Sequence, residues 1–328
     1  MNPTVLVVGG AGYIGSHCVK MLARAGHRVI TYDSLVRGHR DAVRYGDFVK
    51  GDLGDSAKLS RLFTDRHVDA VMHFAAFASV AESVAHPAMY FENNFEKTKT
   101  LLDVMLEHRV TRFIFSSTAA TFGVPAYVPM DEAHPQAPIN PYGESKRKVE
   151  RLLSDYDARL HLRFVAFRYF NAAGCDPEGE LGERHDPETH LVPLALRAAL
   201  GTGTPLSVFG DDYATPDGTC VRDYIHVNDL CGAHILGLEY LLREDRSNVF
   251  NLGNGSGFSV KEIITAVEKV TGKKVPYTMG PRRPGDPPVL IANPALAQRV
   301  LGWKTGFPGV EQIIATAHRW ETKAVNSV

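Results

Sequence analysis

Short runs of apolar residues alternate with longer segments of mixed polarity along the first half of the chain. The runs at 5–8, 27–33, 47–52, 68–76 and 112–118 have the length and composition of strands in a buried sheet. Between them, segments such as 16–26 and 96–110 have the apolar spacing of helices. Strands that alternate with helices predict an α/β fold with a doubly wound parallel sheet.

The second half changes in composition after residue 175. The stretch CDPEGELGERHDPETH at 175–190 is rich in glycine, proline and acidic residues, which predicts a loop-rich linker. Helices are predicted at 191–201, at 258–272 with a capping box of Ser259 and Glu262, and at 309–324. We therefore predict a first domain at 1–175, to which residues of about 220–255 return, and a smaller α/β lobe at 176–328.

Composition narrows the class of protein. The chain has 328 residues, of which 44% are hydrophobic and 22% charged, and its formal net charge of -1 does not favour nucleic acid or acidic membranes. No signal-peptide pattern and no apolar run of roughly 18 residues is found, which predicts a protein without a membrane span. The cysteines are scattered at Cys18, Cys175, Cys220 and Cys231. This pattern predicts free thiols in the cytoplasm and neither disulfides nor a metal site.

A glycine motif follows the first predicted strand. In GGAGYIGSH, Gly9 permits a tight turn, Gly12 allows close approach to a pyrophosphate, and Gly15 allows a helix to pack on the strand. The helix N-terminus then faces the negative charge. Asp33 ends the second strand, where its carboxylate can bind both ribose hydroxyls and repel a 2′-phosphate, so NAD is favoured over NADP. The alternative is a turn whose glycines serve only packing.

A second glycine-rich stretch, GNGSG at 253–257, follows a strand and precedes a helix. No ribose-binding acid follows it at the required distance. We therefore predict a turn into the second lobe and not a second nucleotide site.

Small and polar residues end several predicted strands. Asp52 and Leu53 follow the third strand, Ala76 ends the fourth, and Thr118 ends the fifth. Ligands of doubly wound sheets bind at the carboxyl ends of the strands. We therefore expect these residues to converge on the cofactor, with Asp52 and Leu53 near its adenine.

The stretch PYGESK at 141–146 places Tyr142 and Lys146 one helical turn apart. Pro141 suits the first turn of a helix, so both side chains share one helix face. A nearby ammonium favours a phenolate, and a bound nicotinamide cation would lower the tyrosine pKa further. Tyr142 is thus a candidate base near neutral pH, and Thr118 can supply a second hydroxyl to the reacting oxygen. The alternative is a solvated helix start.

These motifs together resemble the extended short-chain dehydrogenase/reductase superfamily, and within it the UDP-glucose 4-epimerase (UDP-galactose 4-epimerase) family. The similar stretches span nearly the whole chain; they are GGAGYIGSH, HFAAFASVAES, YFENN, FSSTAATFG, PYGESK, FRYFNAAG, VFGDDYATPDGTCVRDYIHVNDL, FNLGNGSG and RRPGD.

The resemblance implies a Rossmann fold that binds NAD in the first domain and a UDP-sugar mainly in the second lobe. It also implies a homodimer, in which the helices at 96–106 and 145–154 would pack across subunits. The implied reaction is 4-epimerisation: a proton and a hydride leave the sugar, the 4-keto intermediate turns over, and both return. NAD is regenerated and should stay bound.

The resemblance implies catalytic, cofactor-binding and substrate-binding roles for individual residues. Tyr142, Lys146 and Thr118 match the catalytic residues. The cofactor-binding positions it implies are Gly9, Gly12, Tyr13, Ile14, Gly15, Asp33, Ser34, Asp52, Leu53, Phe74, Ala75, Ala76, Asn94, Ser116, Tyr142, Lys146 and Tyr169. The substrate-binding positions it implies are Thr118, Tyr142, Asn171, His190, Leu191, Ser207, Phe209, Arg222, Tyr224, Arg283, Asp286 and Leu290. Chemically, the arginines suit a diphosphate, Phe209 suits uracil, and Asp286 suits ribose hydroxyls.

Four positions depart from the family pattern. Ala78 replaces a lysine found in some members, and Phe122 replaces a frequent tyrosine. Leu290 stands where some hexose-restricted members have tyrosine, which hints at N-acetylhexosamines as substrates. His190 stands where some members have a phosphate-contacting asparagine; a phosphate contact and a packing role both remain open.

Other activities stay open. The sugar could be a hexose, an N-acetylhexosamine or a pentose, because small groups are weakly discriminated, by about 1–3 kcal/mol each. A nucleotide-sugar 4,6-dehydratase is disfavoured, since Ala119 and Ala120 follow Thr118 where that chemistry needs Asp and Glu. A dehydrogenase that releases NADH and a non-catalytic NAD sensor are further alternatives, although the chain keeps both Tyr142 and Lys146.

Overall fold

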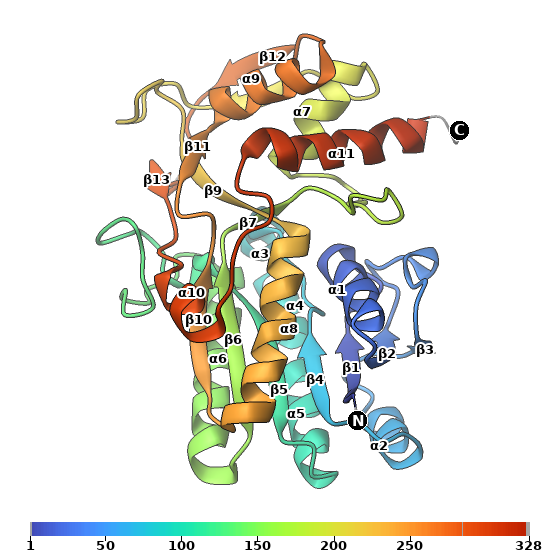
Figure 1. The fold of residues 1–328 in the computed structure, drawn as a ribbon. Coiled ribbons are helices and arrows are strands. Elements are labelled where there is room, and N and C mark those ends of the chain that lie inside the picture. The colour runs from blue at the N-terminus through green and yellow to red at the C-terminus, as the bar shows by residue number, and fades with distance from the viewer. Residues whose placement is uncertain (1, 284, 326–328) are drawn as a thin grey trace.

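A seven-stranded parallel sheet forms the centre of the larger lobe (Figure 1). The computed structural model describes residues 2–283 and 285–325. The strand order is β10-β6-β5-β4-β1-β2-β3, so the chain winds outward from β1 in both directions, as predicted. The strands are β1 (Thr4–Val8), β2 (Arg28–Asp33), β3 (Asp47–Lys50), β4 (Ala70–His73), β5 (Arg112–Thr118), β6 (Arg163–Tyr169) and β10 (Asn248–Leu252).

Alternate residues of β1 build two separate cores, because neighbouring side chains of a strand point to opposite faces. Val5 and Val7 join the core under one helix layer, and Leu6 and Val8 join the other. The first layer contains α1 (Tyr13–Arg24), α8 (Val227–Glu244) and α10 (Ala295–Leu301). The second layer contains α2 (Ser56–Asp65), α5 (Lys97–Glu107) and α6 (Pro141–Leu160). The sheet is thus buried on both faces.

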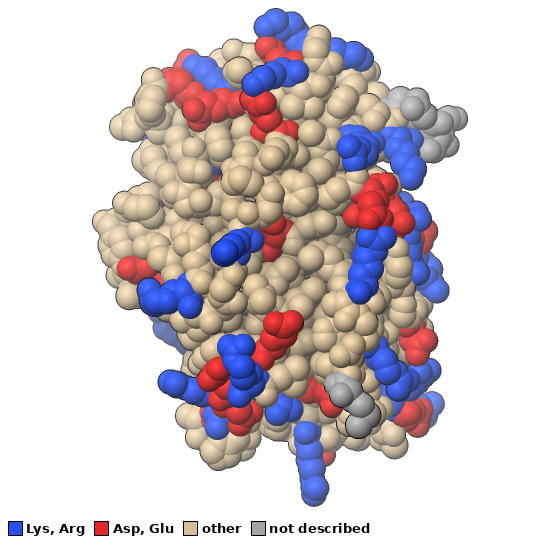
Figure 2. Space-filling model, viewed as in Figure 1, with Lys and Arg blue, Asp and Glu red and all other residues tan. Residues whose placement is uncertain are grey.

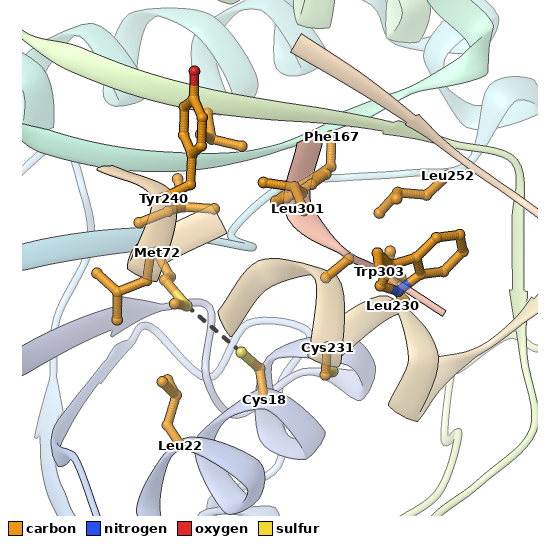
Figure 3. Close-up of a cluster of buried hydrophobic side chains, with 14 of the residues drawn as sticks. Cys18, Leu22, Met72, Phe167, Leu230, Cys231, Tyr240, Leu252, Leu301 and Trp303 are labelled. Carbon is orange, nitrogen blue, oxygen red and sulfur yellow. Dashed lines mark hydrogen bonds between the residues drawn. The ribbon is translucent and has the colours of Figure 1, made fainter. Parts of the chain in front are cut away.

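Figure 3 shows the first of these cores. Cys18 and Leu22 of α1 meet Met72 of β4, and the Cys18 Sγ lies 3.6 Å from the Met72 Sδ. Trp303, which follows α10, is 2% exposed and donates its indole N–H to the Asp229 carbonyl of α8. A late segment of the chain therefore completes the core of the first lobe.

The smaller lobe has its own sheets and core. β11, β9 and β13 form one sheet, β7 pairs with β9, and β8 pairs with β12. The lobe's elements are β7 (Asn171–Ala173), α7 (Leu191–Leu200), β8 (Leu206–Phe209), β9 (Val221–His226), β11 (Gly257–Ser259), α9 (Val260–Thr271), β12 (Tyr277–Gly280), β13 (Val289–Leu290) and α11 (Val310–Val325). Helices α7, α9 and α11 cover one hydrophobic cluster. The exact domain boundaries remain a prediction.

Short helices complete the molecule. They are η1 (Arg40–Ala42), α3 (Val80–Ala85), α4 (Pro87–Phe91), η2 (Glu92–Glu96, a π-helix) and η3 (Ala119–Thr121). Among the described residues, no helix combines the length and the apolar character that crossing a bilayer requires. On the face drawn in Figure 2, cationic and anionic side chains intermingle, in keeping with the small net charge.

Local signals explain most helix ends. The Asn140 side chain accepts the Gly143 N–H at the start of α6, with Pro141 in the first turn. Ser259 and Glu262 form the predicted capping box of α9. The predicted strand at 68–76 is too long, since β4 ends at His73. Just beyond this end, the backbone of Ala75 packs directly against Gly9.

The GNGSG stretch is a turn between β10 and β11, as predicted. Asp223 fills the place that a phosphate would need. Its carboxylate accepts the N–H groups of Asn254 at 2.8 Å and of Gly255 at 3.1 Å. These amides are therefore bound within the protein.

Candidate active site

The glycine loop between β1 and α1 has an open outer side. A Cβ on Gly9 would lie 2.4 Å from the Ala75 nitrogen, and one on Gly15 would lie 2.1 Å from the Gly9 oxygen. A Cβ on Gly12 would meet only the Gly9 oxygen, at 3.4 Å. Gly12 is also the N-cap of α1 and provides no side-chain cap. Gly9 and Gly15 thus serve packing, while Gly12 leaves room for an anion at the helix N-terminus.

Asp33 lies beside this loop at the end of β2. Its carboxylate accepts the Ala11 N–H at 2.9 Å and the Leu35 N–H at 2.8 Å, and the residue is 8% exposed. These bonds fix the carboxylate at the edge where a ribose would bind. The loop and the acid together have the form of an NAD site.

The residues predicted near adenine follow β2 and β3. The Asp52 carboxylate accepts a hydrogen bond from Lys97 Nζ at 2.8 Å, which helps to hold its pKa below the ordinary value although burial opposes this. Leu53 is 7% exposed and belongs to the second core. The Ser34 hydroxyl accepts the Val36 N–H at 3.4 Å.

The loop after β4 carries Phe74, Ala75 and Ala76, all partly exposed. Asn94, which is 1% exposed, fixes this loop: its Oδ1 accepts the Phe77 N–H and its Nδ2 donates to the Phe77 carbonyl. The Asn94 amide is thus already bonded within the protein, so it positions the loop.

Tyr13 and Ile14 begin α1. The Tyr13 hydroxyl donates to the Gly174 carbonyl at 2.5 Å, which joins the glycine loop to the start of the linker. The Ile14 carbonyl accepts from the Cys231 thiol at 3.5 Å. Both residues are partly buried at the cofactor edge of the first lobe.

The three predicted catalytic residues come from two elements that meet at the sheet edge. Thr118 is the last residue of β5, and Tyr142 and Lys146 lie one turn apart on α6. Lys146 is 3% exposed; its Nζ donates to the Ser116 carbonyl at 2.8 Å and lies 4.7 Å from the centre of the Phe115 ring. The tyrosine is partly exposed.

The electrostatics correct one expectation. Burial lowers the pKa of Lys146 to about 7, and burial raises the pKa of Tyr142, although Thr118 lies close enough to oppose that rise. The expectation that Lys146 lowers the tyrosine pKa is therefore wrong for the chain without its cofactor. The reason is that burial weakens the charge of Lys146, whose ammonium is directed at the Ser116 carbonyl.

A buried histidine lies behind this group, and sequence reasoning missed it. His234 of α8 contacts the Ser116 hydroxyl at 3.1 Å through Nε2 and the rings of Phe74 and Phe167. Tyr169, paired with Thr118 in the sheet, lies edge-on to the same imidazole. Nothing in the local sequence of α8 indicates this contact, because the residues are more than a hundred positions apart.

In the second lobe the structure brings four predicted substrate residues together. Arg222 donates to the Asp286 carboxylate at 2.5 Å and to the Pro287 carbonyl at 2.9 Å. The Arg283 guanidinium lies 4.2 Å from the centre of the Phe209 ring. Arg222 is thus paired within the protein, while Arg283 is the more exposed cation. Pro284, in the same RRPGD motif, lies outside the described residues.

Other predicted substrate residues differ in accessibility. Ser207 is exposed on β8, and Leu191 and Leu290 are partly exposed. The Asn171 side chain donates to the Asp223 carbonyl at 3.0 Å. Tyr224 is 6% exposed and belongs to the core of the second lobe, and its contact with the substrate stays a prediction.

The departures from the family pattern have different settings. Ala78 is exposed, whereas Phe122 is fully buried with the Arg168 guanidinium 5.2 Å from its ring centre. His190 contacts the buried Glu183 carboxylate through Nδ1. The four cysteines are free thiols, and Cys220 is the least buried.

Comparison with known proteins gives concordant matches. The model of the NAD dependent epimerase/dehydratase family matches residues 5–253. UDP-glucose 4-epimerase of Lacticaseibacillus casei is 50% identical over 318 residues, which are 97% of this chain and 96% of that protein.

Two solved structures are similar over nearly the whole chain. UDP-glucose 4-epimerase from Brucella ovis in complex with NAD is 51% identical, with a TM-score of 0.95 and 98% of each chain covered. UDP-glucose-4-epimerase from Stenotrophomonas maltophila, with bound NAD and formylated UDP-arabinopyranose, is 38% identical, with a TM-score of 0.97 and 100% of each chain covered.

Proposed function

Because this chain belongs to the NAD dependent epimerase/dehydratase family, we propose that it interconverts UDP-glucose and UDP-galactose. It is an isomerase that carries out NAD-dependent 4-epimerisation of a UDP-sugar, as are the relatives it matches over nearly its full length. The observation that best supports the specific mechanism is that Thr118 lies within hydrogen-bond reach of Tyr142, with Lys146 one helical turn along α6.

The first lobe fits NAD. Gly12 and the uncapped N-terminus of α1 would hold the pyrophosphate, and Asp33 would hold the adenine ribose. The chemistry that bound NAD would supply is the reversible acceptance of a hydride from carbon 4 of the sugar. Its positive charge would also favour the Tyr142 phenolate, which burial alone disfavours.

The chain's own residues handle the proton. Tyr142 removes the proton from the 4-hydroxyl as the hydride departs, and Thr118 donates a hydrogen bond to the same oxygen. Lys146 stays buried against the Ser116 carbonyl, one helical turn from the phenol. After the 4-keto sugar has turned over about its phosphate linkage, Tyr142 returns the proton. Arg283 and Phe209 would hold the uridine diphosphate during this rotation.

A second substrate class has one specific observation in its favour. Leu290 lies next to Arg222 in the pairing of β13 with β9 and is partly exposed. A side chain smaller than tyrosine at this position would leave room for an N-acetyl group. UDP-N-acetylhexosamines, and UDP-pentoses as smaller sugars, are therefore alternative substrates.

The test uses purified protein without added NAD. UDP-galactose, UDP-N-acetylgalactosamine and UDP-arabinose are incubated separately, and the products are resolved by chromatography. We expect UDP-glucose from the UDP-galactose reaction without added cofactor, because the protein should retain its NAD. This reaction should also be the fastest of the three. A faster reaction with another sugar would contradict the proposed substrate. An absence of product in every tube, even after NAD is supplied, would overturn the epimerase mechanism.

We also propose a homodimer built through α5 and α6. Leu106, Leu152 and Tyr156 lie on these helices and are only partly buried within one chain. Light scattering should give twice the chain mass of 36.0 kDa, and Leu152→Asp should shift it to the monomer. A wild-type monomer would contradict the proposal. The cytoplasmic location remains a prediction from the cysteine pattern.

A further inference from the structure

The linker of residues 175–190 runs between α1 and α11 (Figure 1). Near its end, four side chains converge from a stretch of only eight residues. Glu183, His185, Glu188 and His190 each offer one ligand atom, and these atoms all lie within 4.8 Å of one another. Neither the proton transfer nor the NAD site described above uses this group as a unit.

The distances suit a single small cation. His185 Nδ1 lies 3.0 Å from Glu183 Oε1 and 3.7 Å from Glu188 Oε1. His190 Nδ1 is in close contact with the same Glu183 oxygen and lies 3.6 Å from Glu188 Oε1. In a tetrahedral zinc site, bond lengths near 2.0–2.1 Å place neighbouring ligand atoms about 3.3 Å apart. The observed separations lie on both sides of that value.

Both carboxylates are almost completely buried. The Glu183 side chain is 5% exposed and the Glu188 side chain 2%. Glu188 Oε1 accepts the N–H groups of Thr189 and His190, but its Oε2 is buried without a hydrogen-bond partner. A buried carboxylate oxygen that lacks a donor is costly unless a cation balances it. The unpartnered Oε2 of this buried side chain is an observation separate from the convergence of the four ligand atoms.

We propose that Glu183, His185, Glu188 and His190 bind one divalent transition-metal ion, preferentially zinc. Two imidazoles and two carboxylates are typical ligands of zinc, whereas magnesium and calcium prefer oxygen ligands alone. The ion's two positive charges balance the two carboxylates. It displaces any protons from the histidine Nδ1 atoms, and no redox step is involved. This inference replaces the sequence-based expectation of no metal site, which considered only cysteines.

The position of the group suggests a structural role. His190 is the N-cap residue of α7, and the Tyr13 ring lies edge-on to the His185 ring at 6.1 Å. An ion here would fasten the linker to the first turn of α7 and against the start of α1. His190 could then reach a substrate phosphate only through Nε2. The proposal rests on residues outside the Tyr142 group and stands apart from the proposed reaction.

A second acidic group nearby provides a matched control. Asp176, Glu178 and Glu180 also converge, but Lys20 Nζ lies within 2.7–3.1 Å of all three. Arg24 pairs with Glu178 as well. Lysine and arginine already occupy the place of a cation in this group, so we expect no metal there.

The experiment uses untagged, NAD-containing protein, so that no affinity tag contributes ligands. After EDTA treatment and desalting, the wild type is titrated with zinc chloride and its bound zinc is measured by mass spectrometry. We expect one zinc ion per chain and a higher thermal unfolding temperature with zinc than with EDTA. Glu188→Gln and His185→Asn should bind zinc at least tenfold more weakly, while Glu178→Gln should match the wild type. NAD content reports whether each variant is folded.

A wild type that takes up no zinc and shows no zinc-dependent rise in unfolding temperature would overturn the proposal, whatever the variants do. Equal zinc binding by the wild type and folded Glu188→Gln would also overturn it, since the ion would then lie elsewhere. Cobalt gives a second measurement: intense visible bands typical of tetrahedral coordination are expected in the wild type. Weak bands of octahedral type would contradict the proposed geometry.

Discussion

Histidines in two parts of this protein have opposite electrostatic surroundings. On the two faces of the large sheet, burial lowers the pKa of His73 to about 3 and that of His234 to about 4. In the linker, burial acts on His185 in the same direction, but hydrogen bonds with Glu183 and Glu188 outweigh it and raise the pKa to about 9. The first region keeps these imidazoles neutral by burying them beside uncharged partners, the hydroxyls of Thr98 and Ser116. The second keeps them charged by pairing them.

The difference matches what each region is proposed to do. A proton is transferred most readily between groups that are not already held by strong ion pairs, and Tyr142 and Lys146 have no carboxylate hydrogen-bonded to them among the described contacts. The linker joins the two lobes, and its proposed role is structural. Its Asp176 carboxylate pairs with Lys20 of α1, and its Pro177 carbonyl accepts from Arg319 of α11, so it is held against both helices.

The largest expected effect is on catalysis at the sheet edge. Tyr142→Phe should lower kcat by roughly 100- to 10,000-fold, because the proton of the 4-hydroxyl loses its acceptor. Tyr156→Phe is the matched control on the same helix; its hydroxyl donates to Asp103 at 2.5 Å, away from Thr118. Turnover of UDP-galactose and bound NAD are measured for both variants. Near-native turnover by Tyr142→Phe would remove its role as the base.

The next effect is on the stability of the paired region. Lys20→Met should lower the free energy of unfolding by about 3–5 kcal/mol, because the buried Asp176 carboxylate loses its cation. The two side chains are 4% and 5% exposed. Lys274→Met is the control: Lys274 pairs with Glu268 but is 90% exposed, so solvent screens the pair and no measurable loss of stability is expected. Urea unfolding measures the free energy of unfolding of both variants. Equal losses of stability would contradict the difference expected between the buried and the exposed ion pair.

The slope of the unfolding free energy against pH should have opposite signs for the histidines of the two regions. The pKa values of His73, His226 and His234 are lowered on folding, so the unfolded chain binds more protons below its histidine pKa of about 6.5. Stability is therefore lost as the pH falls from about 6.5 to 4, by about 1.4 kcal/mol per pH unit for each histidine. Urea unfolding in EDTA at several pH values measures this slope, and a flat profile in that range would be inconsistent with it.

His185 should contribute the opposite slope. Its folded pKa of about 9 lies above the unfolded value, so its stabilisation is complete below about 6.5 and is lost as the pH rises towards 9. Lys146, with a folded pKa of about 7, acts against this trend above pH 7. The test is therefore the difference between the wild type and His185→Asn in EDTA, which should shrink as the pH rises. A constant difference would mean that His185 is not charged at pH 7.

The smallest effect is on sugar choice in the second lobe, outside both regions. Leu290→Tyr should lower the turnover of UDP-N-acetylgalactosamine relative to UDP-galactose by about tenfold, because the pocket loses room. Leu290→Met, which keeps the volume, should leave the ratio nearly unchanged. Chromatography of both reactions gives the ratio. An unchanged ratio in Leu290→Tyr would remove this residue from the sugar pocket.

Local sequence predicts several features of the fold. The parallel sheet follows from short apolar runs between helices, and β5 ends at Thr118 as predicted. The glycine loop, Asp33 and the pair Tyr142 and Lys146 could be placed because each depends on neighbours within one element or one turn. The predicted strand at 68–76 is too long: β4 ends at His73, and the backbone of Ala75 then packs against Gly9, far away in the sequence.

The amino-acid sequence by itself determined the order of the elements, the NAD motif, and which residues reach the carboxyl edge of the sheet, because these depend on local periodicity and spacing. Tertiary structure alone decided the protonation behaviour. Whether Lys146 is charged, whether His234 stays neutral beside Ser116, and whether Glu188 Oε2 lacks a donor depend on burial and on partners from distant segments. The electrostatic free energy of a group is set by everything that surrounds it in space, and a local sequence motif holds only part of that information.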